Sequence, residues 1–299
     1  AAPPPAAPAS HPRGPYPVGN AYTGYRAEMS DPTSAPPGVD RWDCVPTAAH
    51  PYPVILLPGT FYTMAGTWQA LGPMLADAGY CVYSFNYGTN RLTTLTGGRV
   101  AAVGPIPESA AQLASFVTRV RRRTGAARVD IVGWSQGGMM PRWYLKFDGG
   151  AAEVHDLVGL APSNHGTTLR GLFALIDADQ ALGLPAPFTL AGCPACTEQR
   201  HGSTFLRKLN AGGDTVPGVT YTVIETDHDE VVTPYQSAFL QGPNVTNIVL
   251  QDQCPRDHAE HVAMPYDLNA LQDVLNALGP DVAGFQPHCQ PSYPYIGTP

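Results

Sequence analysis

The chain has 299 residues, of which 43% are hydrophobic, and this is enough apolar material for a sizeable core. Its formal net charge of −7 argues against a surface that neutralises phosphates, and so against a nucleic-acid partner. Charged residues make up only 14% of the chain, and no run of about 20 apolar residues could span a membrane.

Cysteine usage and the first residues indicate the compartment. The six cysteines form an even set, as expected of a protein that folds where disulfides persist. Composition alone does not give their pairing. The chain begins with AAPPPAAPAS, which looks like the start of a product of signal-peptide cleavage. We therefore expect a secreted protein.

The first third of the chain predicts an arm followed by a strand–helix–strand unit. Residues 1–35 are expected to form an extended arm rich in proline and alanine, with one domain over 36–299. A short apolar run that ends in Pro-Gly predicts a buried strand over 53–59. Helical spacing of apolar residues predicts a helix over 67–79, and aromatic and β-branched residues predict a strand over 80–88.

The alternation continues to the end of the chain. The clearest helix covers 107–125, and its arginines complement the negative end of the helix dipole. Further strands are expected at 127–134, 156–162, 218–225 and 244–250, and further helices from Ser135 and over 266–278. Alternating strands and helices predict a mostly parallel sheet covered by helices on both faces. A long stretch punctuated by glycine and proline, about 163–215, interrupts this order as an insertion.

Ser135 lies in the pattern G-W-S-Q-G, where a predicted strand becomes a predicted helix. This context is typical of the nucleophile elbow, a strained turn that projects a serine hydroxyl above the sheet. Small residues on either side, here Gly133 and Gly137, let the strand and the helix approach each other. The alternative is that Ser135 only caps a helix.

An oxyanion hole needs two backbone N–H groups near such a serine. One would come from Gln136, directly after Ser135. The other would come from the loop after the first strand, where Gly59 permits a tight turn and Thr60 follows. The Thr60 hydroxyl is a further candidate donor.

An acid and a histidine must follow the serine in that order along the chain. Asp227 and Asp229 lie just beyond a late strand, and His258 and His261 lie just before the last helix. The histidine must reach Ser135 and be held in one tautomer by the acid. Spacing alone does not choose within either pair.

The segments LLPGT, GWSQGG, DEVVTPYQS and 254–278 together resemble the secreted class 2 lipases of bacteria and, more distantly, Candida antarctica lipase B. The likeness covers about residues 36–280 and implies an α/β-hydrolase fold. It implies that Asp229 is the acid, because an acidic residue and valines follow it. It favours His261 as the base by its distance from an Ala-Leu pair at the end of the last helix. An adjacent Asp-His pair in the yeast enzyme keeps His258 as an alternative.

The resemblance also implies the oxyanion donors Thr60 and Gln136 and two disulfides, Cys44–Cys81 and Cys254–Cys289. Cys193 and Cys196 remain, in the sequence GCPACTEQ. A redox pair should open a helix after a strand, and a zinc site needs two more ligands nearby, but neither context is evident. We expect a small structural disulfide.

The insertion departs from the smallest members of the family. Apolar residues at helical spacing within 166–192 predict a lid or the wall of an acyl-chain groove, or else a cover for the core. The groove candidates are Leu169, Leu172, Phe173 and Ile176.

The sequence therefore predicts a secreted, monomeric serine hydrolase of carboxylic esters, most simply a triacylglycerol lipase acting at a lipid–water interface. The expected chemistry uses no metal and no organic cofactor. The alternatives are a cutinase-like esterase or polyesterase that acts on short-chain or polymeric esters, and an inactive binding protein on a hydrolase fold.

Overall fold

The structure is a computed structural model and describes residues 14–168, 192–279 and 282–299. Within these ranges six parallel strands form one sheet in the order β2-β1-β3-β4-β5-β6. The strands are β1 (Val54–Leu57), β2 (Val82–Ser84), β3 (Val129–Trp134), β4 (Val154–Leu160), β5 (Thr220–Glu225) and β6 (Val245–Val249). This is the α/β arrangement expected from the alternation of elements, and the prediction is confirmed.

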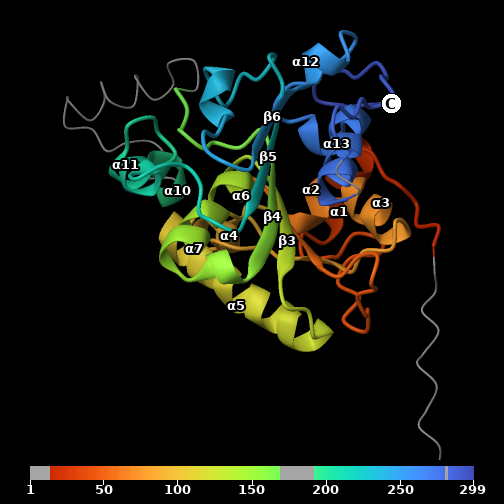
Figure 1. Cartoon of the computed structure of the whole chain (residues 1–299), viewed down its shortest axis with the longest axis horizontal. Helices are drawn as coiled ribbons and strands as arrows, with labels where there is room; N and C mark the ends of the chain where they lie inside the picture. Colours follow the sequence, from red (N-terminus) through yellow and green to blue (C-terminus); the bar gives the residue numbers. More distant parts are fainter. Residues whose placement is uncertain (1–13, 169–191, 280–281) are drawn as a thin grey trace, which may run out of the picture.

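Helices cover both faces of the sheet. In Figure 1, α5, α7, α10 and α11 lie on one side of the strands, and α1, α2, α3 and α13 lie on the other. Each face buries its own apolar cluster, so the strands are packed on both sides. The helices are α1 (Ala21–Ser30), α2 (Met64–Thr67), α3 (Leu71–Asp77), α4 (Arg91–Leu95), α5 (Ile106–Thr124), α6 (Gln136–Met139), α7 (Pro141–Phe147), α10 (Pro194–Glu198), α11 (Thr204–Asn210), α12 (Leu250–Gln253) and α13 (Leu268–Leu278).

The extended arm expected up to residue 35 is wrong where α1 forms. Asn20 caps this helix, and its side chain and that of Thr23 hydrogen-bond reciprocally to each other's backbone N–H groups. Gly24 is buried, and a Cβ there would lie 2.6 Å from the Gly66 carbonyl oxygen. The helix therefore docks closely on α2. Residues 1–13 of the expected arm lie outside the described residues.

Two predicted helices differ in the structure. The helix expected over 67–79 forms only as α3, because α2 ends at Thr67 and the fully buried Trp68 that follows it has a non-helical conformation. The helix expected from Ser135 forms as α6 and α7, because Pro141 begins a new turn without an N–H to donate.

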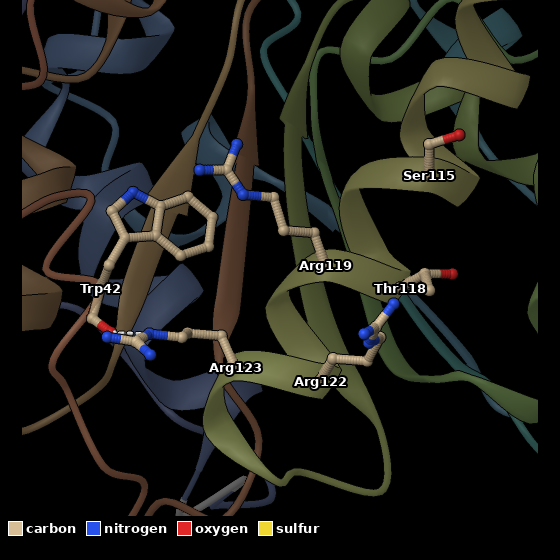
Figure 2. A pocket seen from close by; sticks show the side chains of 6 residues that line it. All are labelled: Trp42, Ser115, Thr118, Arg119, Arg122 and Arg123. Carbon is tan, nitrogen blue, oxygen red and sulfur yellow. Dashed lines mark hydrogen bonds between the residues drawn. The ribbon is translucent and has the colours of Figure 1, made fainter.

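Helix α5 agrees with the prediction and ends at Gly125, whose φ of 73° is the left-handed conformation that closes many helices. Its arginines also brace neighbouring segments. Arg119 lies over the ring of Trp42 at 4.1 Å, and Arg123 Nε donates to the Trp42 carbonyl at 2.7 Å (Figure 2). Arg121 pairs with Glu153, just ahead of β4. These contacts tie α5 to the segment before β1 and to the sheet.

Three disulfides pair the six cysteines as Cys44–Cys81, Cys193–Cys196 and Cys254–Cys289. This is the pairing that the sequence analysis expected. The first joins the segment before β1 to the start of β2, and the second closes the first turn of α10. No helix in the described part of the chain is both long and apolar enough to cross a bilayer.

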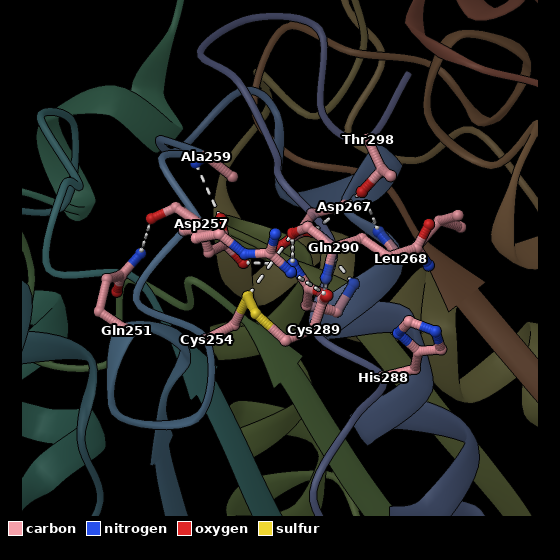
Figure 3. Close-up of a disulfide and its surroundings, with 12 residues drawn as sticks. Gln251, Cys254, Asp257, Ala259, Asp267, Leu268, His288, Cys289, Gln290 and Thr298 are labelled. Atoms are coloured by element: carbon pink, nitrogen blue, oxygen red, sulfur yellow. Dashed lines mark hydrogen bonds between the residues drawn. A yellow bond between two sulfur atoms is a disulfide. The ribbon is translucent and has the colours of Figure 1, made fainter.

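The third disulfide ties the C-terminal tail to the loop that leads into α13 (Figure 3). Around it, Arg256 donates to the Cys289 carbonyl at 3.1 Å, and Thr298 Oγ1 accepts from the Leu268 N–H at 3.0 Å. The Ala259 N–H donates to Asp257 at 2.9 Å. The loop over 254–267, which carries both candidate histidines, is therefore held from the tail side as well as from the sheet.

Candidate active site

Ser135 occupies a strained turn between β3 and α6. Its φ of 56° and ψ of −123° lie in a region that residues with a side chain rarely adopt. The flanking glycines make the turn possible, since a Cβ on Gly133 would lie 1.9 Å from the Gly137 carbonyl oxygen. A Cβ on Gly137 would lie 2.3 Å from the Leu57 carbonyl oxygen. These are the close approaches that the sequence analysis ascribed to the two glycines.

Asp229 and His261 come together although 32 positions separate them in the chain. His261 Nδ1 lies 2.7 Å from Asp229 Oδ2, and both side chains are buried. Asp229 Oδ1 accepts from the N–H groups of Val231 and Val232, at 2.7 Å each. Three hydrogen bonds therefore fix the position of the carboxyl group. Because Nδ1 faces this carboxylate, it carries the proton, and Nε2 is left as the acceptor.

The other members of the two sequence pairs lie elsewhere. Asp227 is exposed and lies 3.5 Å from His228. His258 is exposed too, with Nδ1 at 3.4 Å from His228 Nε2. Neither residue contacts the pair formed by Asp229 and His261. The geometry therefore favours Asp229 over Asp227, and His261 over His258.

The histidine loop is held against the serine turn by Trp134. Trp134 Nε1 donates to the His261 carbonyl at 3.0 Å, and the two rings lie with their centroids 5.5 Å apart. Trp134 directly precedes Ser135, so this contact brings the imidazole beside the turn. In the described residues no hydrogen bond joins the Ser135 hydroxyl to His261. Such bonds are often long in ligand-free enzymes and tighten when substrate binds.

A second carboxyl group lies beneath Asp229. Glu225 ends β5 and is fully buried. Burial, and then the negative charge of Asp229, raise the pKa of Glu225 well above its usual range. The environment of Glu225 therefore disfavours its ionisation, while the Asp229 carboxyl is the one that faces the imidazole. The sequence analysis did not single out Glu225, since a glutamate at the end of a strand carries no local signal.

Thr60 and Gln136 lie on the other side of Ser135. A Cβ on Gly59 would lie 3.1 Å from the Ser135 Cβ, so the loop with Thr60 passes directly by the serine. Gln136 is buried, and its side-chain Nε2 donates to Thr60 Oγ1 at 3.1 Å. Among the described residues, the backbone N–H groups of Thr60 and Gln136 find no acceptor. Backbone N–H groups without acceptors on segments beside the serine are what an oxyanion hole requires.

Gln199 completes this donor side, and the sequence analysis missed it. It follows α10 inside the predicted insertion, and its Nε2 donates to Thr60 Oγ1 at 2.8 Å. No motif marks a glutamine 139 positions from its partner, so only the folded chain reveals the contact. The groove candidates Leu169, Leu172, Phe173 and Ile176 lie outside the described residues.

One group of metal-ligand side chains occurs among the described residues. Asp130, His155 and Asp156 bring donor atoms within 4.8 Å of one another, at the ends of β3 and β4 remote from Ser135. His155 Nδ1 lies 3.3 Å from Asp130 and 3.0 Å from Asp156. The hydrogen bond that His155 donates to Asp130 raises the pKa of His155, and burial raises that of Asp156 to about 6. The Nδ1 of His155 therefore lies between two buried carboxyl groups and holds them together.

Comparisons with known proteins identify the family of the chain. A family model described as Lipase (class 2) matches residues 51–273, which is more than half of the chain. This chain belongs to the class 2 lipase family. Lipase B of Pseudozyma antarctica is 24% identical to it over 193 residues, or 62% of this chain and 48% of the relative. The chain therefore spans about half the length of the curated relative that it matches.

Solved structures with the same fold extend the comparison for this member of the class 2 lipase family. Lipase B of Aspergillus fumigatus superposes with a TM-score of 0.61 and 25% identity, over 79% of this chain and 55% of that one. A structure from the metagenome-derived lipolytic enzymes LipS and LipT gives a TM-score of 0.51 with 15% identity, over 79% and 95% of the two chains. At that identity the second match shows the fold alone. The α/β-hydrolase fold is therefore confirmed.

Proposed function

We propose that this class 2 lipase is a secreted serine hydrolase of carboxylic esters that cleaves triacylglycerols through an acyl-enzyme at Ser135. The observation that carries the proposal is the buried pair of Asp229 and His261, 2.7 Å apart and held beside the strained turn at Ser135. A nucleophile, a base and an orienting acid in this order are the minimum set for acyl transfer.

In the first half of the reaction, Ser135 Oγ attacks the ester carbonyl carbon while His261 Nε2 takes its proton. Asp229 holds the imidazole by its Nδ1–H and stabilises the imidazolium. The carbonyl oxygen becomes an oxyanion that accepts from the N–H groups of Thr60 and Gln136. Collapse of this intermediate breaks the ester C–O bond, and the imidazolium protonates the departing alcohol.

In the second half, a water molecule takes the place of the alcohol. His261 removes a proton from this water as it attacks the acyl-enzyme carbonyl, and a second oxyanion forms in the same hole. When this intermediate collapses, Ser135 Oγ leaves and recovers its proton from His261, and the carboxylic acid is released. The chemistry as written draws only on side chains, backbone N–H groups and water.

Secretion and the lipid substrate rest on different observations. Three disulfides in one chain are typical of an oxidising compartment, which favours export. The family of the chain, and its similarity to two proteins named lipase B, favour a lipid ester as the substrate. A groove of apolar residues would bind longer acyl chains more tightly, by about 0.8 kcal/mol for each buried methylene.

Substitution of the serine tests the proposal directly. We expect Ser135→Ala to fold with an unchanged melting temperature and to lose activity by a factor on the order of 10⁶. An organophosphonate probe should label the wild-type chain at Ser135 and leave the variant unlabelled, as mass spectrometry of the peptides would detect. A wild-type chain that takes up no probe would contradict the proposal and favour an inactive binding protein.

A substrate series separates a lipase from an esterase. Rates on p-nitrophenyl esters from acetate to palmitate should rise with chain length, and emulsified triacylglycerol should be hydrolysed. A sharp preference for acetate without activity on the emulsion would instead favour a cutinase-like esterase or polyesterase.

A further inference from the structure

The Thr60 hydroxyl receives two hydrogen bonds from side-chain amides. Gln136 Nε2 donates at 3.1 Å and Gln199 Nε2 at 2.8 Å. The orientation of both amides follows from a second contact of each Nε2. Gln136 Nε2 also lies 2.8 Å from the Ala102 carbonyl, and Gln199 Nε2 lies 3.2 Å from the Ala195 carbonyl. A carbonyl accepts only from a donor, so each NH₂ group, and not the amide oxygen, faces Thr60.

These contacts determine what the hydroxyl can do. A hydroxyl oxygen has two lone pairs and one hydrogen. Both lone pairs of Thr60 Oγ1 are taken by the two amides, so its hydrogen must point elsewhere. In the described part of the chain this hydrogen has no acceptor. It is therefore available to donate, next to the backbone N–H of Thr60 and beside Ser135.

Gln199 is itself fixed from three directions. It is 6% exposed, and its Oε1 accepts from Ser163 Oγ at 2.8 Å. Its backbone N–H donates to the Ala195 carbonyl at 3.0 Å. Helix α10 is closed by the Cys193–Cys196 disulfide at its start, and Glu198 accepts from the Ile106 N–H at 2.7 Å near its end. The amide therefore meets Thr60 from a rigid short helix.

We propose that Gln199 is a positioning residue for the oxyanion hole: with Gln136, it keeps the Thr60 hydroxyl turned so that its proton donates to the oxyanion. The inference rests on the proposed ester hydrolysis and extends it to a residue far from the motifs. Without the Gln199 amide, one lone pair of Thr60 Oγ1 is open, and the hydroxyl rotates freely among competing partners. A carboxylate in its place would accept the Thr60 proton and withdraw it from the substrate.

The test combines three substitutions with a double variant. Thr60→Val removes the hydroxyl, and removal of one oxyanion donor lowers kcat by about 10²–10³-fold. Gln199→Glu, which keeps the shape of the side chain and reverses its polarity, should lower kcat to a similar degree and leave KM within about twofold. Thr60→Ser should retain most of kcat, because it keeps the hydroxyl.

The decisive readout is the combination of Thr60→Val with Gln199→Glu. If Gln199 acts through the hydroxyl, Gln199→Glu should have no further effect on kcat in the Thr60→Val chain. The affinity for a trifluoromethyl ketone, which binds Ser135 as an oxyanion, should fall in parallel with kcat. An equal loss from Gln199→Glu in both backgrounds, or no loss in the wild-type background, would overturn the proposal.

Controls separate positioning from folding and from the proposed function. Gln272→Glu is a matched change, because Gln272 Nε2 also donates to the carbonyl four residues earlier, Leu268, at 2.9 Å, but outside the site. It should leave kcat unchanged, and labelling by an organophosphonate should report an intact Ser135 in every variant. A wild-type chain without esterase activity would refute the proposed function, and the role of Gln199 with it. An active wild type with a silent Gln199→Glu would refute the positioning role alone.

Discussion

The two sides of Ser135 are built in different ways. On the acid–histidine side, Asp229 is fixed by the backbone N–H groups of Val231 and Val232, which lie in its own turn. On the donor side, Thr60 is fixed by side-chain amides from two other elements, 76 and 139 positions away. The first side is a local motif that any chain with this turn can form. The second exists only when α6, α10 and the loop after β1 have assembled.

This difference shows which substitutions each side of Ser135 tolerates. Backbone N–H groups hold Asp229 whatever the neighbouring side chains are, so substitutions around it act mainly through charge. The donor side depends on particular side-chain amides. A carboxylate in place of one amide would accept the Thr60 proton instead of donating to the Thr60 hydroxyl. The predictions below test the acid–histidine side, and the substitutions at Thr60 and Gln199 supply the matching test of the donor side.

The largest effect is expected at the histidine. His261→Ala should lower kcat by a factor on the order of 10⁶, because it removes the proposed base that takes the Ser135 proton. His258→Ala should retain most activity, since its ring contacts His228 and not the acid. Steady-state rates of both variants on one soluble ester decide which of the two histidines is the base. An inactive His258→Ala with an active His261→Ala would reverse the assignment.

A smaller loss is expected at the acid. Asp229→Asn keeps the size of the side chain but presents an amide to Nδ1, so the imidazole loses its anchoring charge and its tautomer. We expect kcat to fall by about 10⁴-fold. Asp227→Asn, an identical change two residues earlier on the surface, is the matched control and should stay within about twofold. Equal losses in the two variants would show that the turn, and not the charge, is what matters.

The smallest effect on rate is expected at Glu225. The fold holds this carboxyl protonated, and the unfolded chain ionises it above a pH of about 4.3, so the native state binds the extra proton. This contribution makes stability fall as the pH rises above that value, by at most about 1.4 kcal/mol per pH unit. Glu225→Gln removes this pH-dependent contribution to the free energy of unfolding.

The variant should therefore gain more stability at pH 8 than at pH 5, as urea unfolding at each pH would measure. Its kcat should stay within a few-fold of the wild-type value, because a neutral amide replaces a neutral acid. A gain of the same size at both pH values would indicate that Glu225 is ionised in the native state.

Much of the fold and the acid–histidine side followed from the sequence because their causes are local. Short apolar runs marked the strands, and Gly133 and Gly137 marked the turn at Ser135. The residues alone left Asp227 and Asp229 open, since both follow the same strand. What separates them is whether the carboxylate turns back onto its own backbone N–H groups, as Asp229 does.

The parts that sequence reasoning missed depend on distant contacts. Helix α1 buries little of its own surface, and it forms where Gly24 allows close docking on α2. The sequence around Gln199 gives no sign of its contact with Thr60, which forms only when α10 packs beside the loop after β1. Glu225 is set apart first by its full burial at the end of β5 and then by the charge of Asp229. The contact of Gln199 and the docking of α1 involve residues far along the chain, and the burial of Glu225 depends on the packing of the whole sheet.

The disulfide between Cys254 and Cys289 has a mechanical consequence. A force applied at residue 299, for example by immobilising the protein on a surface, reaches the core by two covalent routes. One passes through the tail into α13, and the other crosses the disulfide directly into the loop that carries His261. Attachment at that end therefore loads the loop of the proposed catalytic base, whereas attachment on α1 loads a helix that carries none of the candidate site residues. An immobilised catalyst made from this chain should be tethered through α1.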